Sequence, residues 1–508
     1  MNDPLRLDPD VPPRAGRLVM VDIDGTRLGD EQADFLRTHG IRAVCLFRRN
    51  LGSDEDILHL TRDLREVMGP GALIGIDQEG GSVIRATTVP QAPAAMALGA
   101  ADDAALAREV GAAVSRGVRR FGFNWNFAPV LDVNSNPDNP VIGERSFGAD
   151  PLAVARLAGA WLDGALSEGV ACCVKHFPGH GDTHVDSHHG SPVVDKPLHA
   201  LQALELVPFR ALAPAAPAMM TAHIVYPQLD PEVPATLSRR ILGGLLREQW
   251  GYDGVVITDS LVMRAIHDRF GHERAAVMTL QAGADMAMAL GSREDQEAAL
   301  RAIDAALRDG RLPTEAARRS AARLDALAQR FPAGAAAYDA TARAADEALM
   351  QRAWARGLTA VGDPSPPVRG ERLRVFAQRE VPCDGVSEAG LPGTALPGLF
   401  AGLGPLELVL ADRLHELRWP QPEAGVRDIL VSNTRDRFGA VARDWRPALH
   451  LAVWNPFQVL DVAAPALVTW GYAPGALDAL RAWLHGDAPA PGRAPVALRR
   501  PLTVTESR

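Results

Sequence analysis

The chain has 508 residues, which is more than one ordinary hydrophobic core accommodates, so two domains are expected. Hydrophobic residues make up 47% and charged residues 23%, a composition typical of a folded globular protein and not of a disordered one. The net charge of −9 is modest and no Lys/Arg-rich block occurs, which argues against a nucleic-acid partner.

The start of the chain and its cysteines indicate the compartment. Residues 1–17 are rich in Pro, Asp and Arg and lack the apolar core of a signal peptide. No run of about 18 apolar residues occurs, as a membrane span would require. The four cysteines include no CxxC pair, so neither a zinc ribbon nor a disulfide framework is expected. The sequence predicts a cytoplasmic, reduced protein without a membrane partner.

Short apolar runs alternate with amphipathic helical patterns from about residue 17 to 310. The strand candidates are residues 18–23, 43–47, 73–77, 124–133, 170–176, 218–225, 254–259 and 285–290. The helix candidates between them include residues 54–68, 104–121, 151–168, 238–250 and 293–308. Eight strands, each followed by a helix, predict an α/β fold with a (β/α)8 barrel of the TIM type over residues 17–330. An N-terminal extension, residues 1–16, precedes it.

An open doubly wound sheet is the alternative for the first domain. However, no Gly-rich dinucleotide loop follows the first strand, so the barrel is favoured and no cofactor is expected.

The second half of the chain predicts a smaller α/β domain. Residues 331–349 are Ala-rich and helical, and they are expected to link the two domains. Strand candidates follow at residues 373–377, 406–410, 428–431, 449–454 and 466–469, with a helix candidate at 474–485. We expect this domain to cover residues 350–508 and to carry few catalytic groups.

Polar residues stand at or just after the carboxyl ends of five predicted strands. They are Asp77, Asp132, Lys175 with His176, His223 and Asp259. In a (β/α)8 barrel the loops at this face converge on one mouth, where the chemistry takes place. A single such residue would only end a strand, whereas six from five strands predict a shared site.

Lysine is almost absent from this chain. The 53 basic residues include only Lys175 and Lys196, so 51 are arginines. A lysine retained against this bias suggests a need for its compact ammonium group in place of a planar guanidinium. Lys175 opens the stretch 175–189, which holds five of the fourteen histidines. We expect the active site there.

The histidines of this stretch allow two interpretations. Four of them recur every four residues from His176 to His188, a spacing that would form a metal-binding face on a helix. One proline and two glycines within residues 177–181 would break that helix, so no metal is expected. The better unit is Asp186 with His188, because a nearby carboxylate can orient an imidazole and stabilise its protonated form, as general acid–base catalysis requires.

Asp259 ends an apolar strand and could present its carboxylate as a nucleophile, although such an aspartate also commonly ends a strand or caps a helix. A sugar needs several charged or bidentate partners to hold its hydroxyl and N-acyl groups. The candidates for that role are Asp77, Arg85, Arg145, Lys175 and His176. The two arginines could equally form structural ion pairs.

These residues fall in motifs that resemble those of the family 3 glycoside hydrolases, in particular the bacterial β-N-acetylhexosaminidases that release N-acetylglucosamine from cell-wall fragments. The motifs are residues 76–81 (IDQEGG), 136–147 (NPDNPVIGERSF), 175–188 (KHFPGHGDTHVDSH) and 254–259 (GVVITD). The resemblance covers residues 17–330. The second half is more weakly similar to the α/β sandwich domain of the two-domain members.

The resemblance implies a role for each candidate. Asp259 would be the nucleophile and His188 the general acid/base, assisted by Asp186. The terminal sugar would be bound by Asp77, Arg85, Arg145, Lys175 and His176, and His223 is expected to join them. In the β-glucosidase branch the acid/base is commonly a glutamate from the second domain, so the loop with Asp186 and His188 separates the two branches. One departure is Ser260, where many relatives carry another residue after the nucleophile.

The implied reaction is a two-step hydrolysis that retains the anomeric configuration. A histidine adds no negative charge near an anionic leaving group, and the same argument leaves room for phosphate as acceptor. Phosphorolysis and β-glucosidase activity therefore stay open as alternatives, with a zinc-dependent hydrolase and a non-catalytic sugar-binding protein more distant. The expected partner is a small carbohydrate, from muropeptides, chitin or another β-glycoside, and the oligomeric state is left open.

Overall fold

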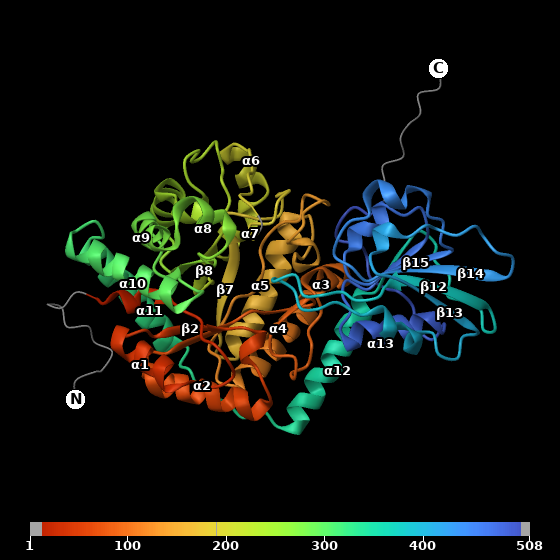
Figure 1. Ribbon diagram of the computed structural model, residues 1–508, viewed down its shortest axis with the longest axis horizontal. Helices are drawn as coiled ribbons and strands as arrows, with labels where there is room; N and C mark the ends of the chain where they lie inside the picture. Colours follow the sequence, from red (N-terminus) through yellow and green to blue (C-terminus); the bar gives the residue numbers. More distant parts are fainter. Residues whose placement is uncertain (1–12, 189, 499–508) are drawn as a thin grey trace, which may run out of the picture.

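The computed structural model describes residues 13–188 and 190–498, and it contains two α/β units (Figure 1). The predicted N-terminal extension, residues 1–16, lies largely outside the described residues. The two units are joined through helix α12 (Ala340–Gly357). The predicted α/β class is confirmed.

Eight parallel strands organise the first unit. They are β1 (Val19–Met20), β2 (Ala43–Leu46), β3 (Leu73–Ile76), β6 (Trp125–Asn126), β7 (Ala171–Phe177), β8 (Ala218–Thr221), β9 (Val255–Thr258) and β10 (Ala287–Met288). Strands β2, β3, β6, β7, β8 and β9 pair in that order, and β1 pairs with β10. Parallel bridges from Val21 to Val44 and from Ile257 to Met286 connect these two sets. The strand pairings therefore close into a ring.

Helices cover the outside of this ring (Figure 1). They are α1 (Asp30–His39), α2 (Asp54–Met68), α3 (Ala95–Ala101), α4 (Ala104–Arg119), α5 (Pro151–Ser167), α6 (Leu198–Ala203), α7 (Leu206–Leu212), the helical segment η5 (Arg240–Gln249), α8 (Arg264–Phe270), α9 (His272–Ala282), α10 (Arg293–Arg308) and α11 (Thr314–Arg330). The longest predicted helices agree with α2, α4, α5 and α10 to within two residues. Side-chain caps at Ser53 and Ser292 account for the sharp starts of α2 and α10.

Alternation along the strands divides the core of the first unit into two layers. In β7, Cys172 packs with α4 and α5, and its neighbour Cys173 packs with Trp125 and Phe127 of the interior. Neighbouring residues of a strand face opposite sides, and both sides of β7 are covered by core residues. The strand is therefore buried along its whole length. Both layers exclude water from the centre, so polar groups collect where the strands end.

Most ring strands of the first unit are shorter than the apolar runs that predict them. The longest run, residues 124–133, pairs regularly only at Trp125–Asn126. Pro129 follows closely and has no amide hydrogen to donate to a strand partner. A hairpin of β4 (Gln78–Gly80) and β5 (Val83–Ile84) was not predicted. It depends on Gly80 and Gly81, whose φ angles of 111° and 60° favour glycine.

The second unit is built on a six-stranded sheet with the order β11, β16, β15, β14, β12, β13. The strands are β11 (Thr359–Val361), β12 (Arg372–Gln378), β13 (Leu406–Ala411), β14 (Val426–Ser432), β15 (Leu449–Ala452) and β16 (Ala466–Val468). Only β11 runs antiparallel to its neighbour. Helix α13 (Pro474–Leu484) packs with α12. Strand β11 has only three residues and was not predicted.

The helix that was predicted from residue 331 starts later, at Ala340. Asp339 accepts a hydrogen bond from the backbone N–H of Ala342 and caps α12, while Pro332 and Gly334 keep the preceding residues out of a helix.

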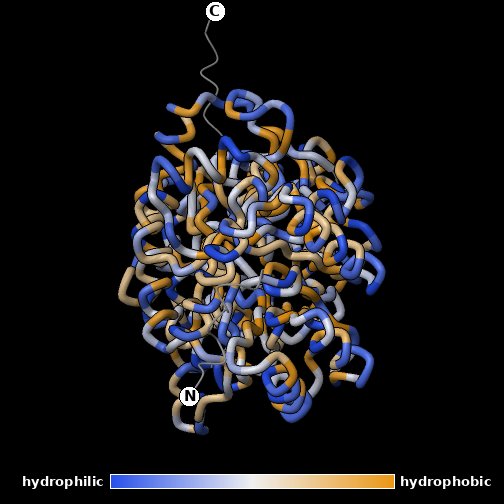
Figure 2. Tube along the Cα trace, turned by 90° about the vertical axis from the view of Figure 1, so that its left-hand side faces the viewer, coloured by the Kyte–Doolittle hydropathy of each residue, from blue (hydrophilic) through white to orange (hydrophobic). Residues whose placement is uncertain are grey.

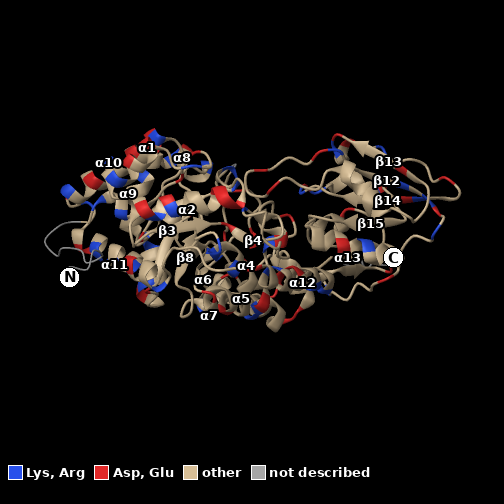
Figure 3. Ribbon diagram, turned by 90° about the horizontal axis from the view of Figure 1, so that it is seen from below, with Lys and Arg blue, Asp and Glu red and all other residues tan. Residues whose placement is uncertain are grey.

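The surface carries mixed polarity and charge. Hydrophilic and hydrophobic segments alternate over the outer turns in Figure 2, and Figure 3 shows acidic and basic residues interspersed along the outer helices. Across residues 13–188 and 190–498, no helix has both the length and the apolar character needed to cross a membrane.

Candidate active site

A cavity of about 90 Å³ lies at the carboxyl ends of the ring strands. Its walls include seven of the nine predicted site residues, namely Asp77, Arg85, Arg145, Lys175, His176, His188 and Asp259. Lys175 and His176 belong to β7, and the others lie in segments that follow β3, β5, β6, β7 and β9. Since these segments are up to 182 positions apart in the chain, from Asp77 to Asp259, it is the parallel arrangement of the strands that brings them together.

A buried charge cluster forms one side of this cavity. Lys175 Nζ lies 2.7 Å from Asp77 Oδ1 and 2.7 Å from Glu79 Oε1. Arg145 donates two hydrogen bonds to Glu79, with Nε–Oε2 at 2.9 Å and Nη2–Oε1 at 2.8 Å. Burial alone would raise the pKa of Glu79, but Arg145 and Lys175 lower it far below its ordinary value. Glu79 is therefore a carboxylate at neutral pH, between the positive charges of Arg145 and Lys175.

His176 is held by Asp132, which lies in the segment after β6. Asp132 Oδ2 accepts a hydrogen bond from His176 Nδ1 at 2.6 Å, and its Oδ1 accepts from the backbone N–H groups of His176 and His180 at 3.1 and 2.7 Å. Asp132 is fully buried, yet His176 and His180 lower its pKa against the effect of burial. With Nδ1 occupied in this way, His176 is left with Nε2 for any partner in the cavity.

The histidine-rich segment after β7 is a loop and not a helix, as its proline and glycines predict. His180 anchors it from inside through Thr183, whose Oγ1 lies 2.9 Å from His180 Nδ1. Burial and the neighbouring His176 lower the pKa of His180 to about 4, so this ring is neutral at pH 7. His180 therefore acts as a fixed support under the loop.

His188 and Asp186 form a pair at the rim of the cavity. Asp186 Oδ1 accepts hydrogen bonds from His188 Nδ1 at 2.8 Å and from its backbone N–H at 2.9 Å. Burial would lower the pKa of His188, but the hydrogen bond and charge of Asp186 raise it above its ordinary value. In turn, His188 lowers the pKa of Asp186 to about 2 although burial opposes this. Asp186 therefore favours the imidazolium form of His188. Because Asp186 binds Nδ1, the Nε2–H of the ring is not used within this pair.

Asp259 follows β9 directly and lines the same cavity as His188. Its Oδ1 accepts a hydrogen bond from the backbone N–H of Ser260 at 2.7 Å. Burial would raise its pKa, but the positive potential of His223, His176 and His188 and the Ser260 N–H lower it. Asp259 is therefore a carboxylate at neutral pH, as a nucleophile must be.

His223 contacts the residue after Asp259 and is not among the residues that line the cavity. Its Nδ1 is 2.8 Å from Thr236 Oγ1, and its Nε2 is 2.9 Å from the carbonyl oxygen of Ser260. Both ring nitrogens therefore have protein partners. This arrangement supports the turn that carries Asp259, and direct sugar binding by His223 stays a prediction.

Two contributors to the site were not predicted. The first is Glu79, which lies within the motif 76–81. Its side chain contacts Lys175 together with that of Asp77, and the sequence gives no sign of this second contact. The second contribution comes from the second unit, because Gly385 and Val386 also line the cavity. No local pattern could have revealed that contact, since it joins residues about 300 positions apart.

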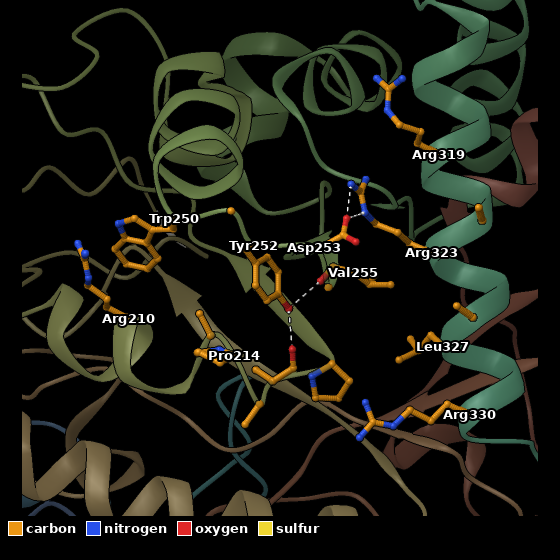
Figure 4. Close-up of a pocket in the computed structure, with 18 of the residues that line it drawn as sticks. Arg210, Pro214, Trp250, Tyr252, Asp253, Val255, Arg319, Arg323, Leu327 and Arg330 are labelled. Atoms are coloured by element: carbon orange, nitrogen blue, oxygen red, sulfur yellow. Dashed lines mark hydrogen bonds and ion pairs between the residues drawn. The ribbon is translucent and has the colours of Figure 1, made fainter.

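A larger cavity, of about 970 Å³, lies at the opposite, amino ends of β8 and β9 (Figure 4). Its walls include Arg210, Arg319, Arg323 and Arg330 around Trp250 and Tyr252. The sole acidic residue on these walls, Asp253, pairs with Arg323 at 2.7 Å. Without a histidine or a free carboxylate on its walls, this larger cavity lacks the acid, base and nucleophile that the smaller one combines.

Within residues 13–188 and 190–498, no three side chains of His, Cys, Asp or Glu are arranged to hold a metal ion.

Comparisons with known proteins identify the family of the first unit. The family model described as the Glycosyl hydrolase family 3 N terminal domain matches residues 12–327. The chain is 36% identical to the beta-hexosaminidase A of Pseudoalteromonas piscicida over 340 residues, which are 61% of this chain and 57% of that protein. It is 35% identical to the beta-hexosaminidase of Idiomarina loihiensis over 294 residues, 57% of this chain and 87% of that protein.

Solved structures also match the chain over nearly its whole length, and one of them is a member of the same family. The family 3 β-N-acetylglucosaminidase from Paenibacillus sp. str. FPU-7 superposes with a TM-score of 0.82 at 33% sequence identity. The match covers 95% of this chain and 98% of that one.

Proposed function

The chain belongs to glycoside hydrolase family 3, and we propose that it is a retaining β-N-acetylglucosaminidase, which releases terminal β-linked N-acetylglucosamine from small carbohydrate fragments. The observation that carries this proposal is the shared cavity. The Asp259 carboxylate and His188, whose imidazolium form is stabilised by Asp186, open onto the space that Lys175 and its ion-pair partners also line. The names of the curated relatives support the same activity.

In the first step, the Asp259 carboxylate attacks the anomeric carbon of the sugar and the glycosidic C–O bond breaks. The imidazolium of His188 transfers its Nε2 proton to the departing oxygen. The products are a glycosyl ester on Asp259 and a free alcohol. The raised pKa of His188 and the lowered pKa of Asp259 support this assignment of acid and nucleophile.

In the second step, the neutral imidazole of His188 takes a proton from water, and the water oxygen attacks the anomeric carbon. The ester bond to Asp259 breaks and the carboxylate is restored. Two inversions at the same carbon retain its configuration. Asp186 serves both steps, because its hydrogen bond to Nδ1 orients the ring and balances the charge of the imidazolium.

The buried charge cluster suits the recognition of a terminal sugar. Asp77 offers acceptors for two neighbouring hydroxyl groups, as carboxylates do in sugar sites. Lys175, Arg145 and Arg85 offer donors, and their ion pairs hold them in place before a sugar arrives. We assign His176 the same task through its Nε2.

We interpret the closed ring of strands, residues 17–330, as a (β/α)8 barrel of the TIM type and residues 350–508 as an α/β sandwich domain. Cytoplasmic muropeptide or chitin fragments are the substrates that this proposal favours. A panel of chromogenic glycosides decides among sugars: the N-acetylglucosaminide should be the best substrate, ahead of the glucoside and the xyloside. A preference for the glucoside would favour the β-glucosidase alternative.

The replacement Asp259→Ala tests the nucleophile. It should lower the release of nitrophenol from 4-nitrophenyl N-acetyl-β-glucosaminide by at least about 10⁴-fold, since the other carboxylates of the cavity, Asp77 and Glu79, are held in ion pairs with Lys175. The control is Asp253→Ala, which removes an exposed carboxylate at the far end of the ring. Substantial turnover in the Asp259 variant would refute the assignment.

Phosphorolysis is the second candidate, because a histidine acid/base adds no negative charge that would repel a phosphate acceptor. Turnover with and without phosphate, with analysis for a sugar 1-phosphate, separates the two reactions. Loss of activity with a chelator and stoichiometric zinc in the protein would instead favour a metal-dependent hydrolase.

A further inference from the structure

Arg85, one of the expected sugar-binding residues, is held by the second unit of the protein. Its Nη1 donates to Glu388 Oε1 at 2.7 Å, and its Nη2 donates to the carbonyl oxygen of Val386 at 2.8 Å. Toward the cavity, Nη2 lies 3.8 Å from Asp77 Oδ2. Only 8% of the Arg85 side chain is exposed, so its charge depends on protein partners and not on water.

The segment that supplies these partners, residues 384–388, is itself tightly fixed. Asp384 Oδ1 accepts from the backbone N–H groups of Val386 and Ser387 at 2.9 and 2.6 Å. Arg435 donates to Asp384 Oδ2 at 2.7 Å and, across the two units, to the carbonyl oxygen of Val141 at 2.6 Å. The segment is a preformed part of the structure.

The same segment is docked on the strand that precedes Arg85. The backbone N–H of Glu388 donates to the carbonyl oxygen of Ser82 at 2.9 Å, and Ser82 Oγ lies 3.2 Å from Ser387 Oγ. The Val386 side chain packs in one buried cluster with Val83, Val141 and Ile142. Figure 1 shows the chain beyond β12 reaching from the second unit to the first.

From these contacts we propose that the second unit completes the sugar-binding site. Residues 384–388 form one wall of the cavity, and Glu388 is a positioning residue that holds the Arg85 guanidinium beside Asp77. The inference rests on the proposed glycosidase function and adds a task for the second unit.

The physical reason is the geometry of a guanidinium. Its planar fork takes two acceptors in one plane, here the Glu388 carboxylate and the Val386 carbonyl, and this fixes the direction of its remaining N–H groups. Without the carboxylate the side chain would keep a single acceptor and could rotate toward Asp77. A sugar hydroxyl that bridges Asp77 and Arg85 would then lose its fixed partner, and a small displacement of this kind is costly in catalysis.

The test uses the full-length protein with Glu388→Gln and Glu388→Ala. Glu388→Gln keeps a neutral acceptor of the same size, and Glu388→Ala removes it. We expect kcat/KM on the chromogenic N-acetylglucosaminide to fall by about tenfold in the first variant and about a hundredfold in the second, mainly through KM. A fall of less than twofold in both would overturn the proposal.

The control for simple domain docking is Asp138→Asn. Asp138 is exposed and pairs with Arg437 of the second unit at 2.7 Å, away from the cavity. This variant should keep kcat/KM within about twofold, because surface ion pairs contribute little. An equal loss in Asp138→Asn and Glu388→Gln would assign Glu388 a merely structural role.

A double-mutant cycle with Arg85→Ala isolates the positioning effect. If Glu388 acts through Arg85, adding Glu388→Ala to Arg85→Ala should change kcat/KM by less than about threefold. If Glu388→Ala lowered kcat/KM as much in the Arg85→Ala background as it does in the parent, the proposal would be overturned. The parent and Asp259→Ala are measured beside these variants, so a failure of the glycosidase assignment is distinguished from a failure of the role of Glu388.

Discussion

Both lysines of this arginine-rich chain are placed between two carboxylates. Lys175 Nζ lies 2.7 Å from Asp77 and from Glu79, and Lys196 Nζ contacts Asp182 and Glu205. A compact ammonium with three donors can serve two carboxylates that approach from different directions, whereas a planar fork favours one carboxylate in its own plane. The rarity of lysine in the sequence therefore has a structural counterpart at each of its two positions.

The replacement Asp186→Asn tests the pair at the rim of the cavity. Asp186 raises the pKa of His188 against burial, so its loss should let that pKa fall below the ordinary value of about 6.5. Because the proposed first step needs protonated His188, kcat/KM should decline at lower pH than in the parent. The measurement is the pH profile of kcat/KM.

The matched control for that profile is Asp182→Asn, a carboxylate of the same loop that pairs with Lys196 instead of a histidine. Its alkaline limb should coincide with that of the parent. An unshifted limb in Asp186→Asn would contradict the assignment of His188 as the acid.

The replacement Glu79→Gln tests the buried cluster. It leaves Lys175 and Arg145 with one charged partner fewer, so the free energy of unfolding at pH 7 should fall by about 3–5 kcal/mol. The pKa of Glu79 is lowered in the folded protein, so its stabilisation is complete above the unfolded pKa of about 4.3 and is lost as the pH falls through the folded value. The gap between parent and variant should therefore narrow below about pH 4.

Urea unfolding at pH 7, 4 and 3 measures this gap. The control Glu66→Gln changes an exposed side chain on α2 and should alter stability by less than about 0.5 kcal/mol. A Glu79→Gln gap that is constant with pH would contradict the ion-pair explanation.

At the scale of elements, the loop after β7 is positioned by close backbone contact. A Cβ atom at Gly181 would lie 1.7 Å from the carbonyl oxygen of Val133, which is backbone and cannot move aside cheaply. Asn139 reinforces this contact by donating to the His180 carbonyl oxygen at 2.8 Å. The segment after β6 therefore sets the place of the loop that carries His188.

The replacement Gly181→Ala should displace that loop and lower kcat/KM by at least about tenfold, since misplacement of a catalytic group is costly. Steady-state kinetics on the chromogenic substrate provides the measurement. Gly398→Ala is the control, because a Cβ there meets no atom within 4 Å. Parent-like activity in Gly181→Ala would show that the loop adapts.

At the scale of the whole molecule, the two units meet through buried polar contacts next to the active site. Glu144 Oε1 accepts from Ser82 Oγ at 2.7 Å and from Trp454 Nε1 of the second unit at 2.8 Å. Glu144 directly precedes Arg145 of the charge cluster. The interface and the sugar site therefore share one segment of chain, residues 143–145.

The replacement Trp454→Phe keeps an aromatic ring and removes the Nε1–H donor. The free energy of unfolding should fall by about 1–3 kcal/mol, because the buried Glu144 carboxylate loses one of its two donors. Chemical denaturation measures the change. Trp419→Phe is the control, since this ring stacks on Trp445 within the second unit. An equal effect in both variants would argue against a specific contribution of the Glu144 contact.

Much of the local structure was predictable. The eight ring strands of the first unit and strands β12 to β16 of the second all overlap predicted runs, because apolar segments of this length are buried on both faces. The ends of the strands and helices were less predictable, because single hydrogen bonds and backbone angles decide them. Examples are the missing amide hydrogen of Pro129, the cap at Asp339 and the turn at Gly80 and Gly81. The helices α2 and α10, which begin after the N-caps Ser53 and Ser292, agree closely with the predicted ranges.

By itself, the sequence determined the α/β class, the alternation of strands and helices, and the clustering of polar residues at strand ends, because periodicity and capping are local properties. Tertiary structure alone decided that Glu79 joins Lys175 to Arg145, that His223 contacts the residue after Asp259, and that Glu388 reaches Arg85. Those contacts join segments from about 40 to about 300 residues apart. Burial removes these charged groups from water. Each of them must therefore bind an opposite charge or a hydrogen-bond partner that the fold places beside it.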